Sequence, residues 1–429
     1  MSCGSCAGPT AILGGGWAGL ACAVELAAAG VPVTLFESAK QLGGRARSVD
    51  WRGIPIDNGQ HLMVGAYRAT LRLMQRLGTA RLLERRPLDL RVPGFRLALP
   101  RLPAPWHLAA GLLRAEGLTW SEKRAAVRFI QHLKSLRFRL PQDLPADRFL
   151  RNQPATLVDR LWGPICIAAL NTPLATASAQ VFCNVLRDSL MGARGDSDLV
   201  MNRAAMGRLL PEAAAAFITE RGGDVRLSHR IEGVRSDCVG LRLAGWDESF
   251  RNVVIATHPA HAAALTTGFP ALAGVRAQLA AFTWQPIATL WLRFAAPPGF
   301  PFPMLGLGPG QAPWAFERND LAPGMVAIVE SADGPHLRLP PEALRERYLQ
   351  RLAEAIGPLP ALTDWKLIVE KRATWACTPG LDRPDPATPQ PGLYLAGDYT
   401  AGPYPATLEG AVRSGVECAA RILAGACSK

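Results

Sequence analysis

The residues whose types and spacing suggest chemistry begin close to the start of the chain. Residues 14–19 read G-x-G-x-x-G, in which Gly14, Gly16 and Gly19 are the fixed glycines. In this pattern the first glycine allows a tight turn, the second lets a pyrophosphate approach the backbone, and the third lets a helix pack closely on a strand. The pattern therefore predicts a site for the phosphates of a dinucleotide.

The segments around this motif are those that a dinucleotide site needs. Residues 10–13 and 33–36 are short apolar runs typical of buried strands, and residues 17–29 predict a helix between them. The first turn of that helix, which includes Ala18, would offer unpaired N–H groups to the phosphates. Glu37 follows the second strand, where a carboxylate accepts hydrogen bonds from ribose hydroxyls and disfavours a 2′-phosphate.

A second group of residues near the end of the chain fits the same ligand. Residues 393–396 predict a strand that ends at Gly397 and Asp398, and a helix is expected from Thr407 and Leu408 onward. Asp398 would hydrogen-bond the ribityl chain or a phosphate of FAD, and the positive end of the helix would stabilise the anion of reduced flavin. An ordinary turn aspartate is the alternative interpretation of Asp398 alone.

Further residues favour FAD over NAD. The segment 43–45 reads GGR, and in FAD enzymes of the amine oxidase superfamily such an arginine lies near the pyrophosphate and flavin; Gly44 and Arg45 are the matching residues here. Ile231 follows a glycine turn and a predicted strand, which would place it beside the adenine. The surroundings of Cys377 do not match a flavin attachment sequence, so noncovalent FAD is expected.

Composition limits the remaining possibilities. The chain has 429 residues, 49% hydrophobic and 19% charged, which is sufficient for two domains with large apolar cores. Nine cysteines show no paired framework and residues 1–9 lack the features of a secretion signal, so a cytoplasmic protein is expected. Cys3 and Cys6 form a lone C-x-x-C without further ligands at a suitable spacing, so no metal site is expected.

The net charge of +12 suggests an acidic partner, but no nucleic-acid-binding motif is present. Residues 102–139 combine apolar side chains, tryptophan and many arginines and lysines, as interfacial membrane anchors do. No run approaches the roughly 18 apolar residues of a spanning helix. We therefore expect peripheral contact with the inner face of the membrane; a cationic helix packed on its own domain is the alternative.

The predicted fold class is α/β, with a Rossmann-type FAD-binding domain interleaved with a helical and mixed-sheet substrate domain. The FAD-binding domain is expected to comprise residues 1–90, 202–261 and 371–429. The substrate domain, which would face the membrane, is expected to comprise residues 91–201 and 262–370.

Three further stretches carry a family resemblance. Residues 57–67 (DNGQHLMVGAY) resemble the second motif of carotenoid-desaturase-like flavoproteins. Residues 162–172, which end in ALNT, and residues 404–415 (YPATLEGAVRSG) resemble the FAD-dependent hydroxysqualene dehydroxylases of bacterial hopanoid synthesis, a branch of the amine oxidase superfamily. The resemblance covers nearly the whole chain. It implies an apolar isoprenoid substrate and neighbouring squalene-synthesis enzymes as partners.

The resemblance also implies a reaction, in which reduced flavin delivers a hydride to the allylic carbon of hydroxysqualene and water leaves. Loss of hydroxide needs an acid, and a dry apolar tunnel would protect the allylic cation from water. His61 is the first candidate acid, with a backbone or FAD contact as its alternative role. Asp188 is the second, with a structural ion pair to Arg187 as its alternative. Tyr404 could flank the flavin with Tyr399, and Gln60 is expected to contact the cofactor with His61. Aromatic residues that would line the tunnel, or else belong to the core, are Trp162, Phe182, Trp284, Trp291, Phe294, Phe300, Phe302, Trp314 and Phe316.

Two other functions remain open at this stage. One is an oxidative flavoenzyme, either an isoprenoid desaturase or an amine oxidase. The other is a non-catalytic FAD-bearing scaffold that presents squalene precursors to membrane enzymes. A flavin that never changes redox state during turnover would favour the scaffold.

Overall fold

The computed structural model describes residues 8–427, so the Cys3 and Cys6 pair lies outside the described residues. Strand β1 (Thr10–Leu13), helix α1 (Trp17–Ala28) and strand β2 (Val33–Phe36) form a βαβ unit, as the sequence predicts. All four residues of β1 are buried. This burial on both faces explains why the strand is a continuous rather than an alternating apolar run.

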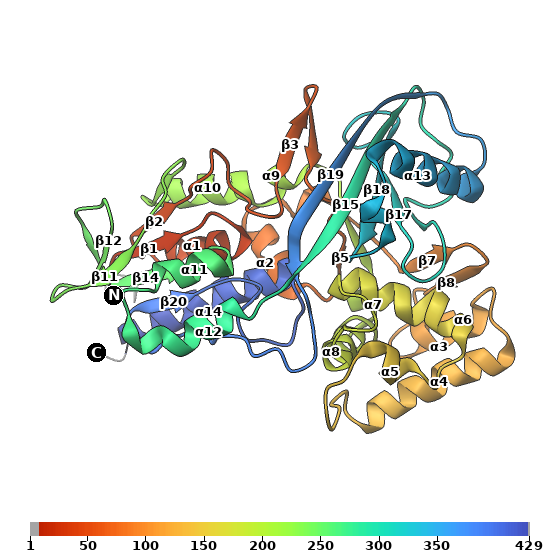
Figure 1. Cartoon of the computed structure of the whole chain (residues 1–429), viewed down its shortest axis with the longest axis horizontal. Helices are drawn as coiled ribbons and strands as arrows, with labels where there is room; N and C mark the ends of the chain where they lie inside the picture. The colour runs from red at the N-terminus through yellow and green to blue at the C-terminus, as the bar shows by residue number, and fades with distance from the viewer. Residues whose placement is uncertain (1–7, 428–429) are drawn as a thin grey trace.

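A five-stranded parallel sheet is assembled from distant parts of the chain. Its order is β10-β2-β1-β14-β20, in which β10 is Asp224–Arg226, β14 is Asn252–Ile255 and β20 is Leu393–Leu395. Helix α1 packs against α14 (Leu408–Cys427) and α10 (Pro211–Glu220). Figure 1 shows these elements together on one side of the molecule. In such sheets ligands bind at the carboxyl ends of the strands.

A second sheet is antiparallel and has the order β16-β17-β18-β15-β19. Its long central strand β15 (Trp284–Phe294) alternates, with Leu290 and Leu292 in the core under α13 (Pro341–Ile356) and Trp291 in the core on the opposite face. The other strands are β16 (Met304–Gly306), β17 (Trp314–Glu317), β18 (Met325–Ser331) and β19 (Leu362–Trp375).

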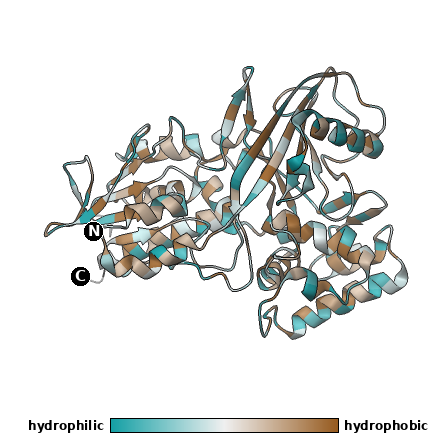
Figure 2. Ribbon diagram, in the orientation of Figure 1, coloured by the Kyte–Doolittle hydropathy of each residue, from teal (hydrophilic) through white to brown (hydrophobic). Residues whose placement is uncertain are grey.

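Residues 106–190 are mainly helical and lie beside the second sheet (Figure 1). The longest of these helices, α4, carries both hydrophobic and hydrophilic residues (Figure 2), and its buried residues Ala126, Phe129 and Leu133 follow a three-and-four spacing along one face. The helices are α3 (Trp106–Arg114), α4 (Trp120–Ser135), α5 (Ala146–Leu150), α6 (Ala155–Leu157), α7 (Gly163–Leu170) and α8 (Ala179–Leu190). Asn171 ends α7 in a left-handed conformation, and its side chain bonds Thr374 Oγ1 of β19 at 2.8 Å. The ALNT stretch therefore ties the helices to the second sheet.

Shorter elements complete the chain. Helices α11 and α12 share a core with β14 and β20, and the domain boundaries given above stay predictions. The remaining elements are β3 (Ser48–Trp51), β4 (Ile54–Asp57), β5 (Met63–Val64), α2 (Arg68–Arg76), β6 (Leu83–Arg86), β7 (Asp89–Val92), β8 (Phe95–Ala98), β9 (Leu199–Asn202), α9 (Met206–Leu209), β11 (Val234–Ser236), β12 (Leu241–Leu243), β13 (Ser249–Phe250), α11 (Pro259–Leu265) and α12 (Ala273–Ala280), besides short 3-10 and π turns.

Candidate cofactor and active site

Glycine occupies the three fixed positions of the motif for different structural reasons. A Cβ on Gly14 would lie 2.5 Å from the carbonyl oxygen of Ala256, and its φ of +116° is itself unfavourable for other residues. A Cβ on Gly19 would lie 2.0 Å from the carbonyl oxygen of Gly14. The protein itself requires these two glycines, because the turn and the helix leave no space for side chains.

Gly16 is different. Its backbone is extended (φ −76°, ψ 177°), and a Cβ there would meet only Gly44 Cα, at 3.9 Å. Neither the backbone nor the packing therefore requires glycine at this position. Gly16 lines the large cavity of the molecule together with Gly44 and Ala18, and its missing side chain leaves space where a bound group would contact the helix N-terminus. The cradle fits a pyrophosphate.

Glu37 makes local hydrogen bonds that sequence reasoning did not foresee. Its Oε2 accepts from the backbone N–H of Gly15 at 2.8 Å, and its Oε1 accepts from that of Ala39 at 2.8 Å. The carboxylate therefore fixes the glycine loop while lining the cavity. Its contact with a ribose stays a prediction.

The two ends of the chain meet at an ion pair. Arg45 Nη2 lies 2.6 Å from Asp398 Oδ1, and Arg45 Nη1 donates to the carbonyl of Ala373 at 3.1 Å. Gly397 donates its N–H to Ser414 Oγ at 2.8 Å. The sequence places Arg45 and Asp398 near one ligand, but it gave no sign that they pair with each other.

The C-terminal motif starts helix α14 against the same cradle. Thr407 Oγ1 accepts the backbone N–H of Gly410 at 3.1 Å, so the regular helix begins at Leu408. A Cβ on Gly415 would lie 2.1 Å from the carbonyl oxygen of Ala18, which shows how closely α14 crosses α1. Glu409 accepts two backbone N–H groups at the start of α2, at 3.1 and 2.9 Å. Much of this motif therefore serves to hold the helices together.

One cavity of about 960 Å³ connects these features. It also contains all three candidate catalytic residues. Gly19 is absent from its wall, as expected for a packing glycine. The predicted cofactor residues that line it are Gly14, Gly16, Ala18, Glu37, Gly44, Arg45, Gln60, His61, Ile231, Gly397, Asp398, Thr407 and Leu408. Cys377 does not line it, and noncovalent attachment of FAD stays a prediction.

Tyr404 and Asp188 both line the cavity, and their side chains are close enough to interact. Burial and the neighbouring Asp188 raise the pKa of Tyr404 to about 12, so the phenol keeps its proton at neutral pH. Arg187 Nε donates to Asp188 Oδ1 at 2.7 Å, and the guanidinium of Arg413 lies 4.9 Å from the centre of the Tyr404 ring. Tyr404 is therefore a protonated phenol beside Asp188, with Arg187 next to the carboxylate and Arg413 next to the ring.

His61 also lines the cavity. Its Nε2 is buried without a hydrogen-bond partner among the described residues. Burial, together with the positive charges of Arg318 and Arg45, lowers the pKa of His61 to about 4. The ring is therefore neutral at pH 7, and its Nε2 is left without a partner from the described residues.

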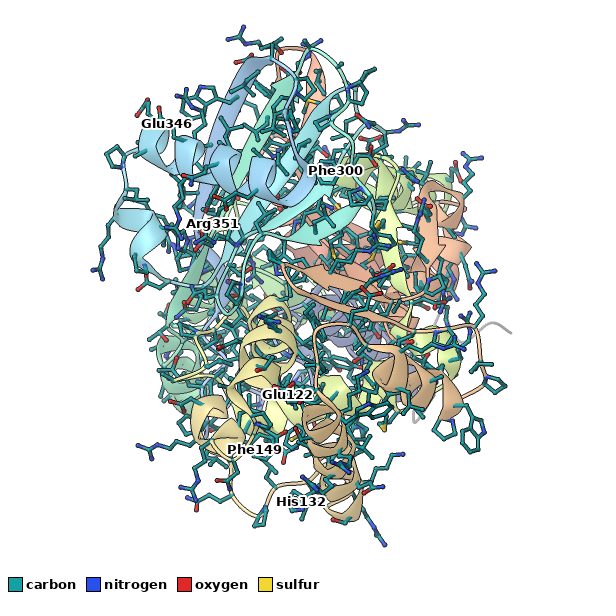
Figure 3. The ribbon with its side chains drawn as sticks, turned by 90° about the vertical axis from the view of Figure 1, so that its right-hand side faces the viewer. Glu122, His132, Phe149, Phe300, Glu346 and Arg351 are labelled. Atoms are coloured by element: carbon teal, nitrogen blue, oxygen red, sulfur yellow. The ribbon has the colours of Figure 1, made fainter. Side chains whose placement is uncertain are left out.

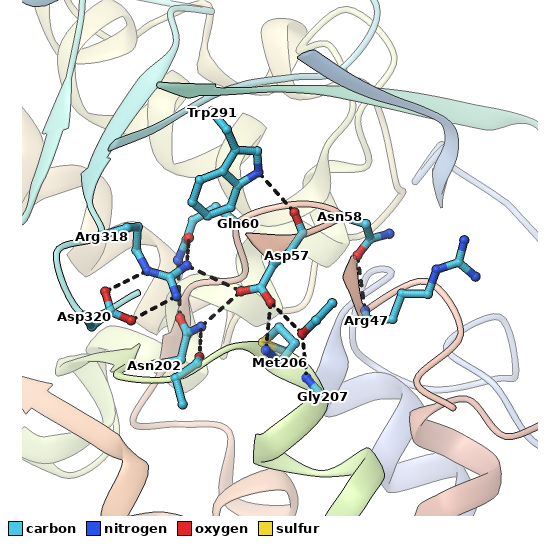
Figure 4. A network of polar contacts seen from close by, with 12 residues as sticks. Arg47, Asp57, Asn58, Gln60, Asn202, Met206, Gly207, Trp291, Arg318 and Asp320 are labelled. Atoms are coloured by element: carbon cyan, nitrogen blue, oxygen red, sulfur yellow. Dashed lines mark hydrogen bonds and ion pairs between the residues drawn. The ribbon is translucent and has the colours of Figure 1, made fainter. Parts of the chain in front are cut away.

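A buried polar network around Asp57 and Gln60 was missed by sequence reasoning (Figure 4). Arg318, only 2% exposed, donates to Gln60 Oε1 at 2.6 Å and contacts Asp57 Oδ2 at 3.4 Å and Asp320 Oδ1 at 3.0 Å. Trp291 Nε1 donates to the backbone carbonyl of Asp57 at 3.1 Å. Burial raises the pKa of Asp57, although Arg318 opposes the rise. The network holds the DNGQH segment against the second sheet.

The predicted aromatic tunnel needs correction. Of the nine aromatic residues proposed, only Trp314 and Phe316 line the cavity. Trp284 instead stacks on His258, with ring centroids 4.1 Å apart. Core packing explains four others, which are buried: Trp162, Phe182, Trp291 and Phe294. Phe300 and Phe302 are partly buried satellites of the second-sheet cores. Aliphatic residues supply most of the apolar wall: Leu88, Leu90, Ile165, Ala168, Val185, Leu199, Ile287 and Val329.

Between residues 8 and 427, no group of three or more potential ligands could hold a metal ion. Within the same range, no helix is sufficiently long and apolar to cross a bilayer.

The parallel sheet and its cradle define a dinucleotide-binding flavoprotein, and the comparisons with known proteins agree. The model of the flavin containing amine oxidoreductase family matches residues 17–423. The chain therefore belongs to this family, it is an oxidoreductase, and FAD is its cofactor. The cyclohexylamine oxidase of Brevibacterium oxydans shares the fold, with a TM-score of 0.69 at 17% identity over 97% of this chain and 99% of that one.

Comparison with individual protein sequences gives more specific similarities than the family model does. The chain is 30% identical to the hydroxysqualene dehydroxylase of Rhodopseudomonas palustris, covering 96% of this chain and 98% of that protein. It is 25% identical to the zeta-carotene desaturase of a Synechocystis species, covering 96% and 97% respectively. The resemblance inferred from the motifs is confirmed.

Proposed function

We propose that this enzyme reduces hydroxysqualene to squalene. The allylic C–O bond breaks, a hydride replaces the hydroxyl group at carbon, and the hydroxyl leaves with a proton as water. Bound FAD in its reduced form supplies the hydride. The observation that carries the proposal is the form of the cavity: the cofactor cradle continues into an aliphatic chamber in which Tyr404 and Asp188 form a polar pair beside apolar walls.

The chain's own residues would bind the isoprenoid and exclude water. The aliphatic wall between the second sheet and helices α7 and α8 suits a long hydrocarbon, which gains about 25 cal/mol for each Å² removed from water. The same dry wall would protect a delocalised allylic cation from capture by water. Amines would gain less from such a wall, which makes amine oxidation the weaker alternative.

Tyr404 is our candidate for the group that protonates the departing hydroxyl. It holds its proton at neutral pH, and Arg187 keeps Asp188 beside it as a hydrogen-bond acceptor. When the phenolic proton turns toward the substrate, Asp188 can accept the hydrogen bond of the water that forms. His61, as a neutral ring, would orient the substrate or cofactor through its free Nε2 rather than act as a cationic acid.

An isoprenoid desaturase is the second candidate, because a zeta-carotene desaturase matches almost the whole chain. Both functions use the same cradle and an apolar substrate. They differ in the redox state of the flavin that the substrate meets. A proton donor beside the substrate favours dehydroxylation, since desaturation removes hydrogen and needs no acid.

The cellular setting follows from the substrate. Hydroxysqualene and squalene are water-insoluble, so we propose that the enzyme works at the inner face of the membrane, beside the enzymes that make its substrate and within hopanoid synthesis. The exposed tryptophans of α3 and α4 support contact with a bilayer.

A substrate panel tests the function. The purified enzyme, loaded with FAD, is reduced anaerobically and given hydroxysqualene; the oxidised enzyme is separately given an isoprenoid hydrocarbon and a primary amine. Products are identified by gas chromatography and mass spectrometry. We expect squalene from the reduced enzyme and no product from the oxidised one. A conjugated polyene or an aldehyde from the oxidised enzyme, with no squalene from the reduced one, would contradict the proposal.

A further inference from the structure

Exposed large apolar side chains are concentrated in one region of the described chain. Nine of them are exposed in the described part of the chain, and five fall within residues 102–127. Trp106 is 67% exposed, Trp120 66% and Leu113 57%. Leu102 and Val127 complete the set, which we call the α3–α4 platform. Two tryptophans with two thirds of their surface in water are costly unless another phase covers them.

The platform is continuous across the two helices. Trp106, the exposed Ala109 and Leu113 follow a three-and-four spacing along one face of α3. Lys123 of α4 donates to the carbonyl of Leu113 at 2.7 Å, and its Nζ lies 5.1 Å from the centre of the Trp120 ring. Lys123 therefore joins the apolar end of α3 to the first turn of α4.

The charge around the platform is strongly positive. Residues 101–139 hold eight lysines and arginines against two acidic residues, which gives +6 of the chain's net +12. Both acidic residues are engaged: Glu122 caps the start of α4 with Thr119, and Glu116 lies 3.6 Å from Arg96. The exposed cations Arg114, Arg124 and Arg128 have no ion-pair partner among the described residues.

We infer that the α3–α4 platform docks on the surface of an anionic lipid bilayer. Exposed tryptophan and leucine insert at the level of the headgroups, and surrounding cations contact anionic lipids, each favouring the bound state. A second copy of this chain fits poorly, because two surfaces of +6 would repel each other. A protein partner fits less well than a bilayer, because protein interface cores are depleted of unpaired charge.

The position of the α3–α4 platform suits the proposed reaction. The role given to the platform here rests on that proposed function. Helix α3 packs against β8, whose partner strand β7 contributes Leu90 to the cavity wall. Figure 3 shows α4, marked by Glu122 and His132, at the opposite end of this side from α13, marked by Glu346. Docking would thus bring the helical part that borders the aliphatic chamber to the lipid.

Vesicle binding tests the inference. The FAD-loaded full chain is sedimented with vesicles of phosphatidylcholine, with or without about 30% phosphatidylglycerol. We expect at least tenfold stronger binding to the anionic vesicles, and at least a tenfold loss for the double variant Trp106→Ala/Trp120→Ala. The matched control is Leu227→Ala/Val239→Ala, two exposed apolar residues elsewhere (43% and 71% exposed), which should bind as the wild type does.

Three results would overturn the inference: no sedimentation of the wild type with anionic vesicles, equal binding by the tryptophan variant and the control, or a dimer in solution that only the tryptophan variant loses. Turnover of detergent-dispersed hydroxysqualene is measured in parallel. Because the platform lies outside the cavity wall, both double variants should keep it. Failure of vesicle binding is therefore distinguishable from failure of the proposed reaction.

Discussion

Replacing Gly16 by valine should abolish FAD binding while the protein stays folded. The backbone of Gly16 is in the extended region, which valine adopts readily, and a Cβ there has no protein atom nearer than 3.9 Å. The cost to the apoprotein should be limited to a poorer helix cap, about 1 kcal/mol or less. Added methyl groups would instead fill the space that the pyrophosphate needs.

The size of the effect follows from ligand linkage. At a free FAD concentration 100 times the Kd, binding stabilises the wild type by about 2.7 kcal/mol. The Gly16→Val variant should gain nothing from the same FAD. Its apoprotein should unfold in urea within about 1 kcal/mol of the wild-type apoprotein.

Gly19→Ala is the matched contrast. Its Cβ would lie 2.0 Å from the Gly14 carbonyl oxygen, so overpacking should destabilise the apoprotein by roughly 1–3 kcal/mol or more. Urea unfolding followed by circular dichroism, with FAD binding followed by flavin fluorescence, separates the two variants. A Gly16→Val protein that binds FAD normally, or whose apoprotein is as unstable as that of Gly19→Ala, would refute the reasoning.

Three further predictions concern the walls of the cavity. Tyr404→Phe should slow squalene formation roughly a hundredfold with FAD still bound, whereas Tyr394→Phe, outside the cavity, should not; equal rates would exclude the phenol as proton donor. The apoprotein should lose stability as the pH falls from about 6.5 to 4, because His61 takes up a proton in this range when the chain is unfolded but stays neutral when it is folded. In urea titrations of His61→Gln, this loss of stability should be smaller by on the order of 2 kcal/mol. An identical pH dependence in the variant and the wild type would contradict the lowered pKa of His61. Arg318→Met should cost about 3–5 kcal/mol by leaving Asp57 buried without its cation; a loss below about 1 kcal/mol by urea unfolding would count against that ion pair.

Local sequence signals predicted much of the fold. The βαβ unit was predictable because buried parallel strands and a glycine-stopped helix leave clear patterns. The helix expected from Thr407 and Leu408 onward runs from Leu408 to Cys427, and it begins at Leu408 because Thr407 caps its first turn.

Contacts between distant segments were not predictable. Nothing in the sequence indicates that Arg318 contacts Gln60, although this hydrogen bond helps to hold the DNGQH segment against the second sheet. Likewise, the aromatic residues of a sequence do not reveal which of them line a cavity and which belong to a core. Trp291 is fully buried, and its Nε1–H donates to the backbone carbonyl of Asp57. The cofactor cradle was predictable because each of its motifs is a short run of neighbouring residues, whereas the substrate wall is assembled from single residues of many elements.

An anaerobic single-turnover experiment tests the central claim most directly. The FAD-loaded enzyme is reduced in mild detergent and mixed with hydroxysqualene, while the flavin absorbance and the lipid are followed together. The account predicts that one squalene forms for each flavin that becomes oxidised, at the same rate. Squalene formation without flavin oxidation, or a reduced flavin that stays reduced in the presence of hydroxysqualene, would contradict it.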